Sequence, residues 1–177
     1  GHFKKGRQDG HGAAYFDNGL IKYRGEWKES MPDGHGTEYS CETGRKVYEG
    51  RFKDGHQHGH GVGTWYSCET SNKLYEGHFR KGKRSGNGAV YFDNGQIEYQ
   101  GEWKEGMPDG HGTEYSCETG RKVYEGRFKD GHQHGHGVGT WYSCETSNKL
   151  YEGHFRKGKR SGNGAVYFDN GQIEYQG

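Results

Sequence analysis

Aromatic residues and glycines alternate with charged residues in short segments along the chain. Tyr23, Gly25 and Trp27 are each separated by one charged residue, and the pattern Tyr-x-Gly-x-aromatic returns at Tyr48 and at four later positions. Successive side chains of a β-strand point to opposite faces, so this two-residue period predicts strands with one aromatic and one charged face. No segment has the 3.6-residue period of an amphipathic helix. The pattern therefore predicts an all-β fold.

Each aromatic strand is followed by a second strand that opens with Gly-x-Gly, as in Gly34-His35-Gly36, and continues to Tyr39. We expect turns at Pro32-Asp33-Gly34 on one side and at Asp17-Asn18-Gly19 on the other, because these residues favour tight hairpin connections. A glycine between two aromatics is expected where a ring lies over the backbone and leaves no room for a Cβ atom. Each unit is thus predicted to be a β-hairpin.

The chain repeats itself with a period of 76 residues, since residues 33–76 recur unchanged at 109–152 and residues 77–100 at 153–176. Each period holds three units of 24, 25 and 27 residues, and the seven units begin at residues 1, 25, 50, 77, 101, 126 and 153. A lone hairpin is not stable in water, but stacked neighbours can bury their aromatic faces. We predict that residues 1–177 form a single array, in which tandem hairpins stack side by side into an elongated, twisted antiparallel sheet.

The first strands supply a structural aromatic ladder, formed by the tyrosine of each pattern and the Trp or Phe four residues later. Its members are Tyr23, Trp27, Tyr48, Phe52, Tyr75, Phe79, Tyr99, Trp103, Tyr124, Phe128, Tyr151 and Phe155.

Composition narrows the classes of protein that fit. Leu, Ile, Val and Phe together number only 20 of 177 residues, too few for a conventional globular core. The 14 Tyr, 8 Phe and 4 Trp residues nevertheless argue against a disordered chain. A formal net charge of +1 argues against a dedicated nucleic-acid binder, and the mixed charges predict a solvated face.

One segment of the chain has the sequence Tyr99-Gln-Gly-Glu-Trp103-Lys-Glu-Gly106-Met-Pro-Asp-Gly110-His111-Gly112. This segment most clearly resembles the MORN (membrane occupation and recognition nexus) repeat. The likeness covers the whole chain, and the units at Gly77 and Gly153 are also similar to a related variant in bacterial antitoxin-like proteins. The resemblance implies stacked β-hairpins and a non-enzymatic role in scaffolding, dimerisation, partner docking or contact with membrane surfaces.

Histidines are the most evident candidate metal ligands. They alternate in two trios, His56, His58 and His60, and His132, His134 and His136. Imidazoles bind Zn, Cu or Ni, but three alternate strand positions span about 13 Å, too wide for one ion unless the turn folds back. A solvated turn is the default, and we expect no cofactor.

Basic residues gather near two turns as candidates for anionic lipid headgroups. They are Arg80, Lys81, Lys83, Arg84, Arg156, Lys157, Lys159 and Arg160. The alternative is that they are solvated turns, because acidic residues elsewhere in each period cancel their charge. No Ser-His-Asp or Cys-His arrangement stands apart from the repeat, so we expect no catalytic residues and no enzyme activity.

The four cysteines, Cys41, Cys68, Cys117 and Cys144, occupy equivalent Ser-Cys-Glu-Thr segments. Equivalent positions in successive hairpins lie about 10 Å apart, beyond the reach of a disulfide, so free thiols are expected within the chain. Free thiols favour a cytoplasmic location, whereas cross-links between chains in a fibre would favour an extracellular one.

Near-identity of the two long repeats leads us to expect a segment of a longer array. Our first functional hypothesis is a non-enzymatic structural protein that associates with itself, through open sheet edges, into a filament or extended assembly. The alternatives are a soluble scaffold that docks another protein on its aromatic face, a peripheral binder of anionic lipid surfaces, and an engineered repeat protein without a biological function.

Overall fold

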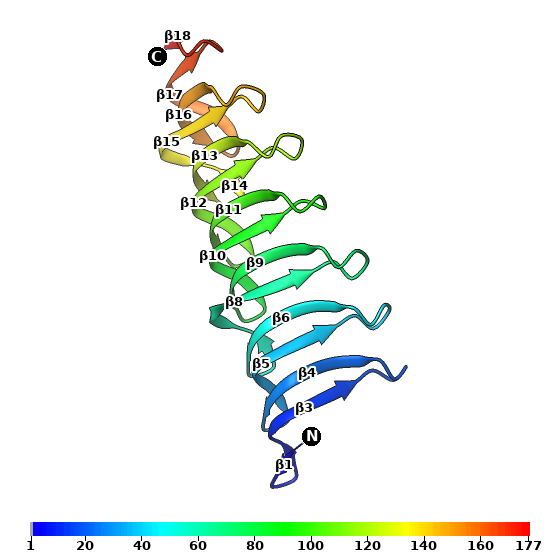
Figure 1. Ribbon diagram of the computed structural model, residues 1–177. Helices are drawn as coiled ribbons and strands as arrows, with labels where there is room; N and C mark the ends of the chain where they lie inside the picture. The colour runs from blue at the N-terminus through cyan, green and yellow to red at the C-terminus, as the bar shows by residue number, and fades with distance from the viewer. Residues whose placement is uncertain (1) are drawn as a thin grey trace. The chain divides into compact units, whose positions relative to one another are not determined.

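The computed structural model describes residues 2–177, with the side chains of residues 60–62 and 136–138 outside the described part. The chain divides into two compact units, Gly1–Gly86 and Asn87–Gly177. Strands and turns make up both units, and residues 2–177 contain no helix (Figure 1).

The strands of the first unit run in chain order and pair antiparallel with their sequence neighbours. They are β1 (Phe3–Lys4), β2 (Arg7–Gln8), β3 (Gly10–Tyr15), β4 (Ile21–Lys28), β5 (Met31–Tyr39), β6 (Lys46–Lys53), β7 (His56–Gln57), β8 (Gly59–Tyr66) and β9 (Lys73–Arg80). Short β7 pairs only with β6, and β1 and β2 form a small hairpin of their own.

The second unit repeats this arrangement, and β10 (Lys83–Tyr91) crosses the boundary between the units. Its further strands are β11 (Ile97–Lys104), β12 (Met107–Tyr115), β13 (Lys122–Lys129), β14 (His132–Gln133), β15 (Gly135–Tyr142), β16 (Lys149–Arg156), β17 (Lys159–Tyr167) and β18 (Ile173–Gln176). Sixteen strands belong to one open antiparallel sheet, which confirms the predicted all-β fold of tandem hairpins.

The hairpin turns at one edge differ from the prediction. The connection between β4 and β5 is the two-residue turn Glu29-Ser30, with φ of 49° and 66°, whereas Pro32-Asp33-Gly34 lies inside β5. The prediction of a turn at Pro32-Asp33-Gly34 was therefore wrong. Two residues with positive φ match the right-handed twist of the flanking strands, and this outweighs the turn preference of Pro-Asp-Gly.

The turns at the opposite edge follow the prediction. In Asp17-Asn18-Gly19, the Gly19 N–H donates to the Phe16 carbonyl at 2.9 Å and the Phe16 N–H donates to the Leu20 carbonyl at 2.8 Å. Gly19 has a φ of 83°, which glycine adopts without strain. These bonds close a three-residue hairpin loop.

Candidate functional site

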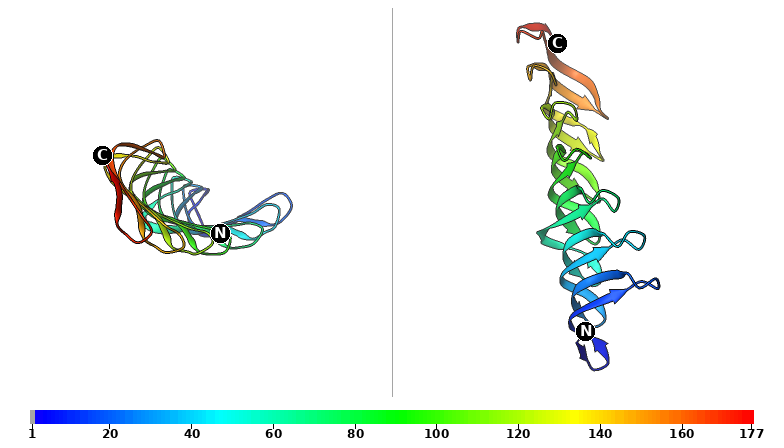
Figure 2. Two further views of the ribbon diagram at one scale, coloured as in Figure 1. Left: turned by 90° about the horizontal axis from the view of Figure 1, so that it is seen from above. Right: turned by 45° about the vertical axis from the view of Figure 1, so that its right-hand side comes forward.

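Each ladder tyrosine lies across a row of glycines and makes the strand bend. The Tyr23 hydroxyl donates to the carbonyl of Glu26 at 3.0 Å, and the ring covers Gly25 and Gly36, which face each other on β4 and β5. The same tyrosine bond to the residue three positions later recurs in five further strands, at 3.1–3.2 Å. Figure 2 shows that the strands are bent along their length. The tyrosines therefore lie on the concave face.

The predicted ladder residues form the core of this single layer. Tyr rings meet the Trp or Phe of their own strand edge-on, with centroids 5.1–5.2 Å apart. Neighbouring hairpins add contacts such as Tyr23–Phe52 and Tyr124–Phe155 at 4.9 and 5.1 Å. Eleven of the twelve are buried, with at most 6% exposure, and Trp27 is half-buried. Edge-to-face pairs of this kind are worth about 0.5–1.5 kcal/mol beyond their buried area.

The third hairpin of each period adds a chain of polar side chains that the sequence analysis missed. The Trp141 indole N–H donates to Gln133 Oε1 at 2.8 Å, and Gln133 Nε2 donates to Glu114 Oε2 at 2.5 Å. The first unit has the same chain, from Trp65 through Gln57 to Glu38, with distances of 2.8 and 2.6 Å. The tryptophan after Gly-x-Gly-Thr, absent from the two shorter hairpins, was the only available signal.

Glu114 is a carboxylate held on the concave face. Burial raises the pKa of Glu114 above its usual range, and the nearby Glu98 carboxylate raises it further, while the Gln133 hydrogen bond lowers it. Among the described residues, no cation forms an ion pair with Glu114. Its charge is met only by a neutral amide, which leaves room for a cationic ligand group.

Arg160 lies on the same face, above the ladder. Its guanidinium carbon is 4.9 Å from the Trp141 ring centroid and 4.7 Å from that of Tyr151. In the first unit Arg84 stacks on Trp65 and Tyr75 at 5.2 and 5.0 Å. Both arginines were predicted to join basic clusters at the turns, but they lie against the aromatic rings.

A shallow hollow of about 440 Å³ opens on this concave face in the second unit. We call it the concave hollow; its lining residues are Glu114, Val123, Gly131, His132, Gln133, Trp141, Tyr142, Leu150 and Gly158. Val123, Tyr142 and Leu150 come from one end of the bent strands, and Gly131 and Gly158 from the turns at the other. The hollow thus combines an apolar surface with one carboxylate.

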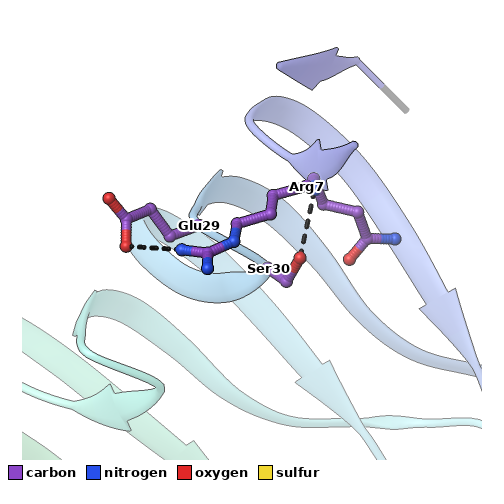
Figure 3. A network of polar contacts seen from close by, with 4 residues as sticks. Arg7, Glu29 and Ser30 are labelled. Carbon is purple, nitrogen blue, oxygen red and sulfur yellow. Dashed lines mark hydrogen bonds and ion pairs between the residues drawn. The ribbon is translucent and has the colours of Figure 1, made fainter. Parts of the chain in front are cut away.

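Two of the other candidate cations, Arg156 and Lys157, line hollows at the turn edge of the second unit. One, of about 500 Å³, is lined by Lys129, Asp130, His132, His134, Arg156 and Lys157. The other, of about 440 Å³, is lined by His134, Gly135, His154, Phe155, Arg156, Ser161 and Gly162. Lys159 lines neither hollow and is exposed, and Arg80, Lys81 and Lys83 of the first unit are exposed as well. Polar contacts also link successive turns, such as Arg7 to Glu29 at 3.2 Å and the Gln8 N–H to Ser30 Oγ at 3.1 Å (Figure 3).

The face opposite the ladder carries paired charges. Lys122 Nζ lies 2.7 Å from Glu125 Oε2 and 4.9 Å from the Tyr142 ring centroid, and the Tyr142 hydroxyl donates to the same carboxylate at 3.3 Å. The Lys122 hydrogen bond lowers the pKa of Glu125. Equivalent pairs join Lys46 to Glu49 and Lys149 to Glu152. Three glutamates of this face are therefore paired with lysines.

The candidate metal ligands do not come together in the described residues. There, no group of three or more His, Cys, Asp or Glu side chains surrounds a common position. His56 and His132 each place Nδ1 2.9 Å from the carbonyl oxygen of the aspartate two residues earlier. His58 and His134 are half-buried, and the side chains of His60 and His136 lie outside the described part.

The cysteines are all unpaired thiols at the turn edge opposite Glu29-Ser30. Cys41 and Cys117 are exposed, and Cys68 and Cys144 are partly covered. In the part of the chain that the structure describes, no helix has the length and apolar character that a membrane span requires.

Comparison with known proteins gives one family. The family model for the MORN repeat matches residues 1–21, 23–42, 48–67, 75–97, 99–118, 124–143 and 151–173. These seven matches agree in number with the seven predicted units. No curated protein matches the chain.

Proposed function

The chain belongs to the MORN repeat family, and from this premise we propose that it is a docking scaffold that holds a segment of another protein on its concave face. MORN repeats are known in structural scaffolds and in scaffolds that bind proteins or lipids, and the family is not an enzymatic one. We choose among these roles from the side chains of this chain.

The concave hollow is the observation that supports docking. Val123, Leu150 and Trp141 line it beside Glu114, on strands that also carry the buried aromatic ladder. Apolar concave surfaces with a few placed polar groups are typical binding sites. The ladder itself is buried and serves as core, so the hollow above it is the part of the aromatic face that a ligand can reach.

Contact with anionic lipids has less support. Arg84 and Arg160 stack on aromatic rings, and Asp130 lies among the cations of the larger turn-edge hollow.

Self-association is a second candidate, favoured by exposed apolar side chains at the hairpin turns. Leu20 is 36% exposed and Phe168 is 47% exposed. Electron microscopy over a concentration series tests it: filaments would support it, and separate particles at every concentration would contradict it.

Affinity capture with matched variants tests docking. The double variant L74E/L150E places charge in the hollow of the second unit and at the equivalent position of the first. The control M31E/M107E makes the same kind of change at two residues that are 43% and 44% exposed and do not line the hollow. Proteins that the native chain and the control retain, and that L74E/L150E loses, would support docking. Equal retention by all three chains would contradict it.

A further inference from the structure

Beyond docking as such, and resting on that proposed function, we infer that the segment held in the concave hollow carries a phosphorylated side chain, which binds at the turn edge of the same unit. The phosphate site is formed by the two turn-edge hollows, which are lined mainly by basic side chains. The predicted ligand is therefore a phosphopeptide with apolar residues close to its phosphate group.

Positive charge dominates the larger turn-edge hollow. Lys129, Arg156 and Lys157 line it together with a single carboxylate, that of Asp130. None of these three cations forms an ion pair with another described residue, whereas Lys122 lies 2.7 Å from a glutamate oxygen. The hollow therefore has a surplus of positive charge that an anionic ligand group can neutralise.

The smaller turn-edge hollow extends this basic surface, because His134 and Arg156 line both hollows. His154 and Ser161 also line the smaller hollow, and the described residues around it include no Asp or Glu. An arginine can donate two parallel hydrogen bonds to a phosphate group, and lysine, histidine and serine side chains can donate others. A phosphate monoester, with up to two negative charges and three acceptor oxygens, uses such a set of donors more fully than a carboxylate does.

The basic surface is continuous with the concave hollow. His132 lines both the concave hollow and the larger turn-edge hollow. Gly131 and Gly158 line the concave hollow, and they follow directly on Asp130 and Lys157, which line the larger turn-edge hollow. A Cβ atom at either glycine would meet no heavy atom within 4 Å apart from its chain neighbours. A bound segment can therefore pass over these glycines from one hollow into the other.

The two hollows select different parts of the ligand. Glu114 lines the concave hollow and repels a second anion there, while Val123 and Leu150 offer apolar contacts. The apolar residues of the ligand therefore belong in the concave hollow and its phosphate at the turn edge. A peptide supplies both kinds of group to adjoining hollows, and for this reason we infer a phosphopeptide rather than a membrane surface.

Two peptide libraries, each presented to the full chain, test the inference. One library fixes a phosphoserine among random positions, and the other fixes an unmodified serine at the same place. We expect the chain to retain more peptide from the phosphoserine library, with apolar residues enriched near the phosphoserine. In fluorescence anisotropy, removal of the phosphate from the most enriched peptide should weaken binding about tenfold.

Variants then locate the phosphate site. The first unit has Arg80 and Lys81 at the positions equivalent to Arg156 and Lys157, so each variant changes both units. R80Q/R156Q and K81Q/K157Q should each weaken binding of the phosphopeptide about threefold or more and leave binding of its unphosphorylated form unchanged. The matched control K28Q/K104Q removes two exposed lysines that line none of the three hollows, and it should bind both forms as the native chain does. Circular dichroism checks that every variant folds.

The outcomes separate the phosphate site from docking. Equal affinity for the phosphorylated and unphosphorylated peptides, or equal losses in K81Q/K157Q and K28Q/K104Q, would overturn the phosphate site and leave docking in place. No retention from either library, or equal binding of the enriched peptide to L74E/L150E and the native chain, would overturn docking in the concave hollow. Sedimentation with phosphatidylserine vesicles that K81Q/K157Q abolishes, without any preference for phosphopeptides, would assign the turn edge to a membrane surface and overturn the inference.

Discussion

Replacing Gly112 by alanine tests whether the tyrosines pack directly on the glycine rows. A Cβ atom at Gly112 would lie 2.3 Å from the Tyr99 hydroxyl oxygen and 2.5 Å from two carbons of its ring. The ring would have to retreat by roughly 1 Å to reach ordinary van der Waals contact. Alanine in an ordinary strand is more favourable than glycine by about 0.5–1 kcal/mol, so the packing predicts a change of opposite sign.

The expected loss of stability follows from the contacts that Tyr99 would lose if its ring moved. Tyr99 is 4% exposed, contacts Trp103 and Phe128, and donates to the Glu102 carbonyl at 3.1 Å. Overpacking a tight site costs about 1–3 kcal/mol, and loss of the hydrogen bond adds about 1 kcal/mol. We expect G112A to lower the free energy of unfolding by about 2–4 kcal/mol.

Urea denaturation, followed by circular dichroism, measures this change in both the native and the Y99V background. With the ring gone, G112A should become neutral or stabilising, so the double-mutant cycle should show a coupling of about 2 kcal/mol or more. The variant G36A, below Tyr23 in the first unit, should behave like G112A. A stabilising effect of G112A in the native background, or an equal cost in both backgrounds, would refute the reasoning.

Two further predictions concern buried aromatic side chains. The Trp27 indole N–H is buried with no hydrogen-bond partner among the described residues, whereas that of Trp103 donates to the Gly88 carbonyl at 3.0 Å. W27F should therefore cost about 1–2 kcal/mol less than W103F in urea denaturation, and equal costs would contradict this. Burial raises the pKa of both Tyr75 and Tyr124 to about 12, from an ordinary value of 10.0. Because the unfolded chain loses these protons first, stability should be complete below pH 10 and decline as the pH rises to about 12, which alkaline titration monitored by circular dichroism would detect.

Much of the fold could be predicted from the sequence because the same residue pattern recurs in each hairpin. The alternation of Tyr23, Gly25 and Trp27 with charged residues fixes which face is buried, and the 76-residue duplication fixes how the hairpins recur. The turn at Glu29-Ser30 could not be read from residue preferences, since neither residue favours positive φ. It follows from the twist of the paired strands.

The candidate site was harder to predict because it depends on contacts across strands. Trp141, Gln133 and Glu114 come from three strands and meet only after the hairpins stack. Arg160 belongs to a basic run in the sequence, but register places it opposite Phe155 and over the neighbouring rings. Charge patterning along the chain cannot distinguish a solvated arginine from one that stacks on tryptophan.

The most direct test of the proposed docking surface uses the four tryptophan indole N–H groups as reporters. In a ¹⁵N-tryptophan-labelled chain, nuclear magnetic resonance titration with a protein that the native chain retains in affinity capture should shift the signals of Trp65 and Trp141, whose indole N–H groups donate to Gln57 and Gln133 on the concave face. The signals of Trp27 and Trp103, which do not line the concave hollow, should stay in place. Shifts confined to Trp27 and Trp103, or binding with no change at Trp65 and Trp141, would contradict docking in the concave hollow.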